Sequence, residues 1–188
     1  MLDKTVPLYE AIMILPKPER RLPVSLPEGY RIRRFQEGGR SAWAKLETSV
    51  GEFDGEAAAE RHFDTEFGPF EAHMRERCLF AEDPSGVKIG TITAWYGRLP
   101  DGWMADRLHW FSVLPDKQGK GIGKALLSSA INLFLSCSYS DVIYLTTSTY
   151  SWKAVGLYRK YGFQPLLRTD SDRTAWAIID RKLAERRR

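Results

Sequence analysis

The chain has 188 residues with a formal net charge of +4, and 43% of its residues are hydrophobic and 28% charged. This size and balance indicate one soluble globular domain with a substantial core. The positive charge is mild, and no basic stripe with interleaved aromatic residues predicts a nucleic-acid partner. The two cysteines, Cys78 and Cys137, belong to no metal-ligand pattern, so we expect a cytoplasmic protein with free thiols and no metal.

The first 29 residues precede the core pattern and indicate an arm. Residues 8–15 could form a strand, but prolines at positions 16, 18, 23 and 27 argue against regular structure until about residue 30. The apolar run is too short for a membrane span, and its acidic flanks do not suit a signal peptide. We therefore expect an N-terminal extension over residues 1–29 and one domain over residues 30–188. Because the apolar run could add a strand to the sheet of a second copy, it is also compatible with a homodimer.

Hydrophobic alternation predicts strands at residues 30–35, 78–81, 87–96, 104–113, 142–147 and 173–180. A helix is expected over residues 41–49, with Ser41 as its N-cap, and a second helix carries Phe63 and Phe67 on one face. Two further helices are expected, one beginning near residue 123 and one over residues 152–161. Tight turns at 83–86 and 100–102 join the early strands into hairpins, whereas helices join the later ones. We therefore expect an α/β (α+β) fold with a mixed, mostly antiparallel central sheet flanked by helices.

The stretch from residue 108 to 127 joins a strand to a helix through a glycine-rich loop. Gly119, Gly121 and Gly123 carry no Cβ, so backbone N–H groups can turn toward one point beside the positive end of the following helix dipole. Lysines add full positive charges at the same place: Lys117, Lys120 and Lys124. This pattern predicts that the loop binds a phosphate or pyrophosphate group.

Two common glycine loops do not fit these residues. The phosphate loop of nucleotide hydrolases has four residues between its glycines and then Lys-Ser or Lys-Thr, whereas three residues separate Gly119 from Gly123 here and an alanine follows Lys124. A dinucleotide fingerprint has a glycine three positions after its second glycine, and neither register of this loop provides it.

The loop instead resembles the coenzyme A pyrophosphate loop of the GNAT superfamily of acyl-CoA-dependent N-acyltransferases. The family pattern Arg/Gln-x-x-Gly-x-Gly/Ala is matched at Gln118, Gly121 and Gly123. A second segment, residues 154–163, resembles the Ala-x-x-Leu-Tyr-x-x-x-Gly-Phe segment of the same superfamily and follows the loop in the right order. The resemblance implies the GNAT acyl-CoA fold, here with an N-terminal extension.

The resemblance also implies an N-acetyltransferase that moves an acetyl group from acetyl-CoA, its co-substrate, to an amine by direct attack in a ternary complex. The acceptor is a small-molecule or peptide amine, which the sequence does not identify. Backbone groups of Phe111 and Val113 would pair with pantetheine and polarise the thioester carbonyl. The pyrophosphate would be held by the loop residues Gln118, Gly119, Lys120, Gly121, Gly123 and Lys124. Ser151 replaces an asparagine with which many members contact pantetheine, and a serine reaches less far.

Acetyl transfer needs a group that accepts a proton from the amine. An amine with a pKa of about 10.4 is mostly protonated at pH 7, and its deprotonation costs on the order of 4–5 kcal/mol. Strand alternation predicts that His109, Phe111 and Val113 share one side, so His109 would face the thioester and act as the base, directly or through water. The alternatives are a structural histidine bonded to a carbonyl, with the base supplied by Glu52 or Asp54 of an acidic loop, which would favour a cationic acceptor.

Tyr158 matches the superfamily's tyrosine near the coenzyme sulfur. Proton transfer from a tyrosine with a pKa of about 10 to a thiol with a pKa of about 8.5 is uphill by roughly 2 kcal/mol, so we expect a hydrogen bond that stabilises the thiolate. The alternative is a packed aromatic side chain with a satisfied hydroxyl. For the whole protein, the alternative to an enzyme is a non-catalytic acyl-CoA-binding sensor or interaction module, because no general base is unambiguous.

Overall fold

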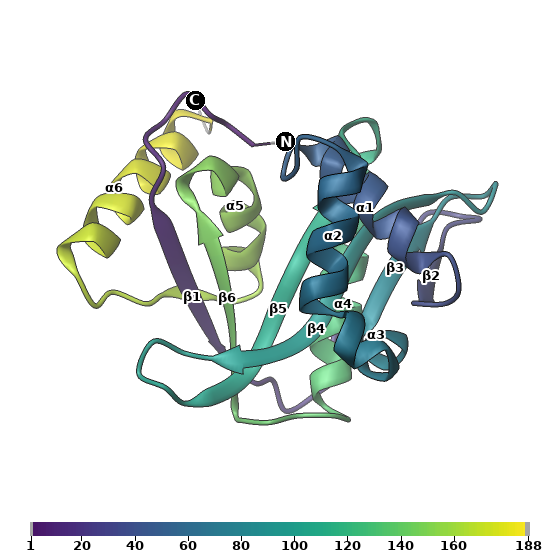
Figure 1. Cartoon of the computed structure of the whole chain (residues 1–188). Helices are drawn as coiled ribbons and strands as arrows, with labels where there is room; N and C mark the ends of the chain where they lie inside the picture. Colours follow the sequence, from purple (N-terminus) through teal and green to yellow (C-terminus); the bar gives the residue numbers. More distant parts are fainter. Residues whose placement is uncertain (1, 187–188) are drawn as a thin grey trace. The chain divides into compact units, whose positions relative to one another are not determined.

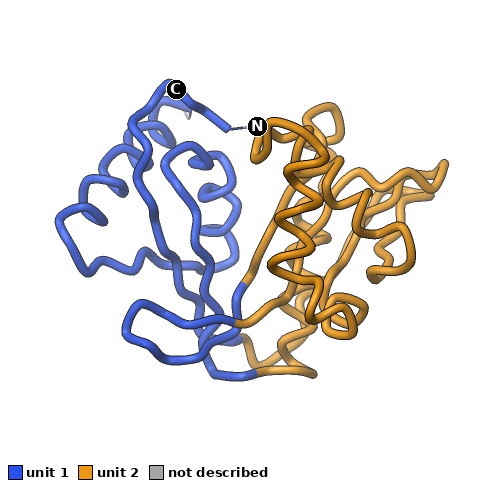
Figure 2. The backbone as a smooth tube through the Cα atoms, in the orientation of Figure 1, with its two compact units in different colours: residues 1–17, 97–107, 139–188 blue, residues 18–96, 108–138 orange. Residues whose placement is uncertain are grey.

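The computed structural model describes residues 2–186, and the chain forms two compact units, which Figure 2 shows in different colours. Unit 1 comprises residues 1–17, 97–107 and 139–188, and unit 2 comprises residues 18–96 and 108–138. Residues 1, 187 and 188, at the ends of the predicted extension and domain, lie outside the described part. Within that part, every helix is too short or too polar to cross a membrane.

The strands of the described chain are β1 (Glu10–Pro16), β2 (Arg31–Arg34), β3 (Cys78–Glu82), β4 (Lys88–Arg98), β5 (Met104–Val113), β6 (Val142–Ser148) and β7 (Gln164–Pro165). The α-helices are α1 (Gly39–Val50), α2 (Glu56–Glu66), α3 (Glu71–Arg77), α4 (Ile122–Phe134), α5 (Trp152–Lys160) and α6 (Asp170–Glu185), labelled in Figure 1. Hydrogen-bonded neighbours follow the order β2-β3-β4-β5-β6-β1-β7, and the pairs β1–β6, β1–β7, β2–β3 and β3–β4 are antiparallel. The predicted mixed, mostly antiparallel sheet with flanking helices is confirmed.

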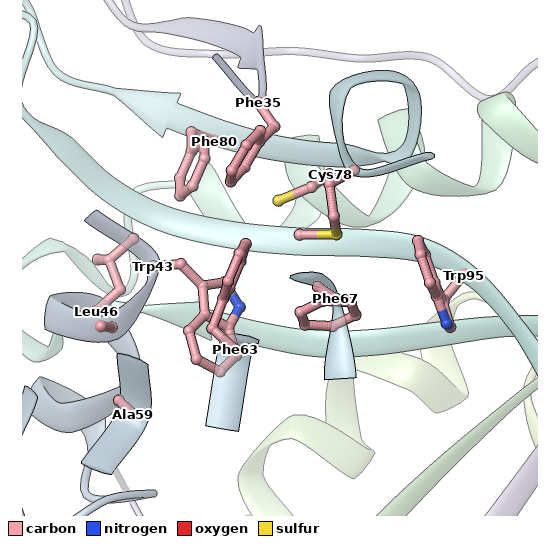
Figure 3. Close-up of a cluster of buried hydrophobic side chains, with 11 residues drawn as sticks. Phe35, Trp43, Leu46, Ala59, Phe63, Phe67, Cys78, Phe80 and Trp95 are labelled. Carbon is pink, nitrogen blue, oxygen red and sulfur yellow. The ribbon is translucent and has the colours of Figure 1, made fainter. Parts of the chain in front are cut away.

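In unit 2, helices α1 and α2 cover one face of the sheet with an aromatic core (Figure 3). Trp43 of α1 is fully buried, and its ring centroid lies 5.4 Å from that of Phe63 and 6.0 Å from that of Phe67. Phe63 and Phe67 stand four residues apart, as a helix face requires, and Phe67 follows the last residue of α2. Truncating one such buried ring to alanine typically costs about 3–5 kcal/mol, so this layer anchors α2 against the sheet.

Helix α4 packs on the opposite face of unit 2. Its residues Ile122, Leu126, Ala130 and Phe134, predicted to form one face, are at most 1% exposed. A Cβ on Gly90 of β4 would lie 3.1 Å from Leu126 Cδ1 and 2.8 Å from a backbone carbonyl of β5, so the helix and both strands approach too closely there for a side chain. This packing fixes the start of α4, where the glycine loop ends.

In unit 1, β1 pairs with β6 along its whole length, from Glu10 opposite Ser148 to Pro16 opposite Val142. Ala11 and Met13 of β1 are fully buried, so the apolar run that left a homodimer open is a strand of the chain's own sheet. Residues 18–29 of the predicted extension lie in unit 2, where the backbone N–H and carbonyl of Leu22 bond the Asn132 side chain of α4 at 2.7 and 2.9 Å. The boundary at residue 29 stays a prediction.

Two predicted details are wrong. Residues 173–180 are not a strand but part of α6, because Thr169 and Asp172 form a reciprocal capping box that starts a helix. Ala175, Trp176 and Ile179 then recur with helical spacing and are buried. Ser41 is not the N-cap of α1, which begins after Gly38, whose φ is +75°. The other predicted strands and helices agree with the structure to within a few residues.

Candidate functional site

The glycine loop is tied to the strand that precedes it. The Leu114 N–H donates to the Ile89 carbonyl at 2.9 Å, which holds the end of β5 against β4. One turn of 3₁₀ helix follows at Pro115–Lys117, and the Gln118 side chain then turns back and donates to the Val113 carbonyl at 2.9 Å. Gln118, predicted to contact the coenzyme, therefore has a visible role in closing the loop.

Gly119 and Gly121 hold the left-handed backbone that the loop needs. Their φ angles are +79° and +85°, and a Cβ on either would meet no atom within 4 Å. Gly121 is the N-cap of α4 and supplies no side-chain cap, whereas Gly123 lies inside the first turn of the helix. The first N–H groups of α4 thus have no side-chain acceptor from the cap residue, the arrangement that binds anions at helix N-termini.

The three lysines of the loop are not equivalent. Lys117 Nζ lies 3.6 Å from a carboxylate oxygen of Asp83 and 3.8 Å from one of Asp116, so its charge is already opposed by two acids. Lys120 and Lys124 are exposed, in the loop and in the first turn of α4. The two acids reduce the charge that Lys117 can add, and phosphate contacts of Lys120 and Lys124 stay predictions.

Trp110 interrupts the alternation of β5. Its φ is +48°, the one positive value of a non-glycine residue in the described chain. In a regular strand His109 and Trp110 would point to opposite faces, but both reach Glu66 at the end of α2. A left-handed residue of this size costs on the order of 1–3 kcal/mol and persists only where its surroundings hold it.

Beyond this interruption the phase of the strand is reversed. The Ser112 hydroxyl donates to Glu47 of α1 at 2.9 Å, so Ser112 follows His109 on the face that α1 and α2 cover. Val113 lies on the other face, since its Cγ2 and Leu126 Cδ1 of α4 are both 3.1 Å from the position of a Cβ on Gly90. The prediction that His109 and Val113 share one side is therefore wrong.

A carboxylate with three nitrogen partners lies beside His109. Glu66 Oε1 is 2.5 Å from His109 Nε2, while Oε2 accepts from Trp110 Nε1 at 2.8 Å and lies 2.9 Å from His62 Nε2. Burial raises the pKa of Glu66, but the bonds and charge of His109 and the bonds from Trp110 and His62 outweigh it and lower the pKa to about 2. Sequence reasoning missed Glu66; its one signal was the helical spacing to His62.

The neighbouring acid on α1 has the opposite environment. Glu47 is 1% exposed, and burial raises its pKa to about 8 despite the hydrogen bond from Ser112. The charge of Glu52 acts in the same direction as burial. Glu47 is therefore a neutral acid at pH 7, and it was not predicted as part of the site.

The acidic loop between α1 and α2 lies against this part of β5. The Phe53 ring is stacked on Trp110 with centroids 5.5 Å apart and an interplanar angle of 26°. Its neighbours Glu52 and Asp54 are exposed. Phe53 thus anchors the loop, and the two acids flank the anchor on the surface of unit 2.

The remaining predicted residues belong to unit 1. Tyr158 of α5 is 7% exposed, and its ring packs edge-on against Phe163 with centroids 5.9 Å apart. Ser151 is the N-cap residue of α5 but makes no side-chain cap. The structure therefore brings together Phe111, Val113 and the loop residues within unit 2, and Tyr158 and Ser151 within unit 1. Among residues 2–186, His, Cys, Asp and Glu form no group of three arranged to hold a metal ion.

The chain is similar to known acetyltransferases in sequence and in fold. Residues 74–165, which include both sequence motifs, match the family model of an acetyltransferase (GNAT) domain. No curated protein matches the chain by sequence. Among solved structures the chain is similar to a GCN5-related N-acetyltransferase from Sphaerobacter thermophilus, with a TM-score of 0.67, 19% identity and coverage of 86% of this chain and 50% of that one.

Two Arabidopsis thaliana structures are also similar. Naa50 in complex with the bisubstrate analogue CoA-Ac-MVNAL gives a TM-score of 0.56 at 21% identity and covers 72% of this chain and 83% of that one. Glucosamine-6-phosphate N-acetyltransferase gives 0.50 at 15% identity, covering 74% and 95%. The chain spans only about half the length of the Sphaerobacter protein, and at these identities the likeness concerns the fold. Residues 74–165 therefore match a GNAT acetyltransferase domain, and the chain shares the fold of these N-acetyltransferase structures.

Proposed function

We propose that the chain is an N-acetyltransferase that transfers an acetyl group from acetyl-CoA to an amine by direct attack in a ternary complex. The observation that carries the proposal is the start of α4, where Gly119 and Gly121 have φ angles of +79° and +85° and face open space. Backbone N–H groups and the helix dipole would bind the pyrophosphate there, with Lys120 and Lys124 adding charge. The GNAT domain match over residues 74–165 supports the same ligand.

In the proposed reaction the amine nitrogen forms a bond to the acetyl carbon, and the carbon–sulfur bond breaks with its electron pair on sulfur. His109 would take the proton that the amine loses, and a backbone donor at Phe111 or Val113 would polarise the carbonyl, an effect that commonly supplies a few kcal/mol. Tyr158 would donate a hydrogen bond to the leaving thiolate. Its burial is compatible with this role and equally with packing.

For the acceptor we propose an amine that binds as a cation, since Glu52 and Asp54 are exposed beside Phe53, which stacks on Trp110. The similar structures include one with a peptide-containing bisubstrate analogue and one named for glucosamine 6-phosphate, so a peptide and a small molecule are both to be tested. A cytoplasmic location is proposed from the free cysteines Cys78 and Cys137. A homodimer stays a prediction, and the apolar run that suggested it is paired with β6 of the same chain.

The first test is calorimetric titration of the protein with acetyl-CoA, CoA and dephospho-CoA. We expect micromolar binding of all three, because they share the pyrophosphate. Gly121→Glu should weaken binding by about 100-fold or more, through steric block and charge repulsion, a loss of about 3 kcal/mol. Gly38→Glu is the matched control, since Gly38 is also a helix N-cap with φ near +75° and open surroundings.

If Gly121→Glu bound acetyl-CoA as tightly as wild type, the assignment of the pyrophosphate site would be wrong. If the folded wild-type protein did not bind acetyl-CoA, the assignment as an enzyme would be wrong. If acetyl-CoA binds, release of free CoA is then followed with a panel of peptide and small-molecule amines. Release that depends on the amine is the expected result. Binding of acetyl-CoA without amine-dependent release of CoA would favour the alternative hypothesis, a non-catalytic acyl-CoA-binding module.

A further inference from the structure

The carboxylate of Glu66 organises the ring that the proposed function uses as its base. His109 Nε2 lies 2.5 Å from Glu66 Oε1, shorter than the about 2.7–2.9 Å usual for a charge-assisted bond between an N–H donor and a carboxylate. The side chain of His109 is 12% exposed and that of Glu66 is 26% exposed, so the pair is largely shielded from solvent. The bond therefore holds the imidazole in one orientation more firmly than a surface contact would.

The backbone is arranged to make this contact. The φ of +48° at Trp110 turns two consecutive side chains, His109 and Trp110, toward the same carboxylate. Trp110 Nε1 donates to Glu66 Oε2 at 2.8 Å, which leaves Oε1 facing His109. Strained backbone that brings a polar pair together beside a candidate site is the kind of outlier from which a functional role can be inferred.

The bond also determines which ring nitrogen carries the proton. An ionised Glu66 can only accept hydrogen bonds, so His109 must donate from Nε2. A neutral imidazole with its proton on Nε2 has its lone pair on Nδ1, and a proton that His109 takes from the amine therefore goes to Nδ1. The imidazolium so formed remains bonded to a full negative charge, which favours the protonated form.

Side chains of α1 and α2 lie around His109. On α2, Glu66 faces it directly, His62 contacts the other oxygen of Glu66, and the Phe67 ring packs edge-on against the imidazole with centroids 6.0 Å apart. On α1, the ionisable group near this stretch of β5 is Glu47, which is bound to Ser112. Glu66 is therefore a carboxylate in direct contact with His109.

We propose that Glu66 is the positioning residue of His109: it fixes the ring with the proton on Nε2 and stabilises the imidazolium that forms when the amine is deprotonated. The proposal rests on the proposed acetyl transfer. Glu66 remains ionised throughout an assay range of pH 5 to 9, so any change in rate with pH in that range that depends on Glu66 reports the titration of its partner.

The test compares Glu66→Gln with wild type in two measurements. In kinetics, kcat/KM for the amine should fall about 10- to 100-fold at pH 7, and its ascending limb should move to lower pH by about one unit, because the ring loses an anionic partner. Binding of acetyl-CoA should not change. Glu60→Gln is the matched control, since Glu60 is on the same helix but pairs with Arg40. A fall in rate with an unmoved limb would overturn the proposal and leave a structural role.

The second measurement does not depend on turnover. With three histidines in the chain, nitrogen-15 NMR of the imidazoles can be assigned with single His→Gln variants. We expect His109 to show the Nε2-protonated form in wild type and to titrate at lower pH in Glu66→Gln. An unchanged titration, or a proton on Nδ1, would overturn the role of Glu66. If the spectra are as expected but no amine releases CoA, the proposed function fails while the contact stands.

Discussion

Glu47 and Glu66 occupy consecutive helices of unit 2, and both side chains reach strand β5. Glu47 receives one hydrogen bond, from the Ser112 hydroxyl, and burial raises its pKa to about 8. Glu66 is also partly buried, but nitrogen atoms of His109, Trp110 and His62 surround it, and its pKa falls to about 2. The difference has two sources: Glu47 is 1% exposed whereas the Glu66 side chain is 26% exposed, and Glu66 has three nitrogen partners where Glu47 has one hydroxyl donor.

The two environments also suit the two acids to different roles. A neutral Glu47 fills space between α1 and β5 and exchanges a hydrogen bond with the strand. An ionised Glu66 can orient a histidine and stabilise its positive charge. Because both acids contact residues of the strand that precedes the glycine loop, changing them one at a time tests whether stability and chemistry divide between them in this way.

The largest expected effect is a pH-dependent stability difference between wild type and Glu47→Gln. Above pH 4.5 the glutamate ionises in the unfolded chain but stays protonated in the fold, so wild type loses about 1.4 kcal/mol of stability per pH unit until the pKa of about 8 is reached. Glutamine has no such slope. Urea unfolding at pH 5.5 and 7.5 should therefore show the wild type falling by about 3 kcal/mol relative to the variant.

Glu60→Gln, which changes a half-buried acid paired with Arg40, serves as the control and should follow the wild-type curve closely. Parallel curves for wild type and Glu47→Gln would mean that Glu47 is ionised in the fold, and the contrast with Glu66 would disappear.

Much of the fold could be predicted because its signals are local. The hairpin turn at residues 83–86 closes with a bond from the Gly86 N–H to the Asp83 carbonyl, and the four-residue spacing on α4 matches its buried face. The glycine loop was equally readable, since its left-handed residues, Gly119 and Gly121, are glycines. In each case the residue type dictates the conformation within one turn.

The predictions from sequence fail where contacts between residues far apart in the chain determine the structure. Nothing in the sequence indicates that Trp110 adopts φ +48°, because the conformation depends on Glu66, 44 residues away. The pairing of His109 with Glu66 spans 43 residues and has no motif. Residues 173–180 alternate like a strand, but the Thr169–Asp172 capping box starts a helix before that pattern can matter. The candidate base was thus predicted, and its partner was not.

The second-largest expected effect is the loss of stability in Glu66→Ala. Removing the carboxylate leaves the nitrogen groups of His109 and Trp110 without their acceptor, which should cost about 2 kcal/mol at pH 7. Since the pKa of Glu66 is lowered, its contribution is complete above pH 4.5 and is lost as pH falls toward 2. Denaturant unfolding should show the gap between wild type and variant closing below pH 4.5. A gap independent of pH would indicate lost packing and not lost charge.

The smallest expected effect is that of Ser112→Ala, which removes the partner of Glu47. The hydroxyl lies 2.9 Å from Glu47 Oε1, and its loss should cost about 1 kcal/mol, because a buried acid then keeps an unsatisfied oxygen. The matched control is Ser41→Ala, where a serine donates to Glu60 at 3.1 Å on the surface and water can replace it. That substitution should change the free energy of unfolding by less than about 0.5 kcal/mol.

The pH dependence sharpens this last comparison. The hydrogen bond from Ser112 lowers the pKa of Glu47, so its removal should raise that pKa further and extend the loss of stability with pH beyond pH 8. Unfolding of Ser112→Ala and of the double variant with Glu47→Gln, followed from pH 6 to 9, measures this directly. If the serine mattered only for packing, the single variant would keep the wild-type slope, and the two substitutions would be additive. A loss of stability that continues beyond pH 8 at the same slope, absent from the double variant, would show that one hydroxyl on β5 tunes the charge of the buried acid.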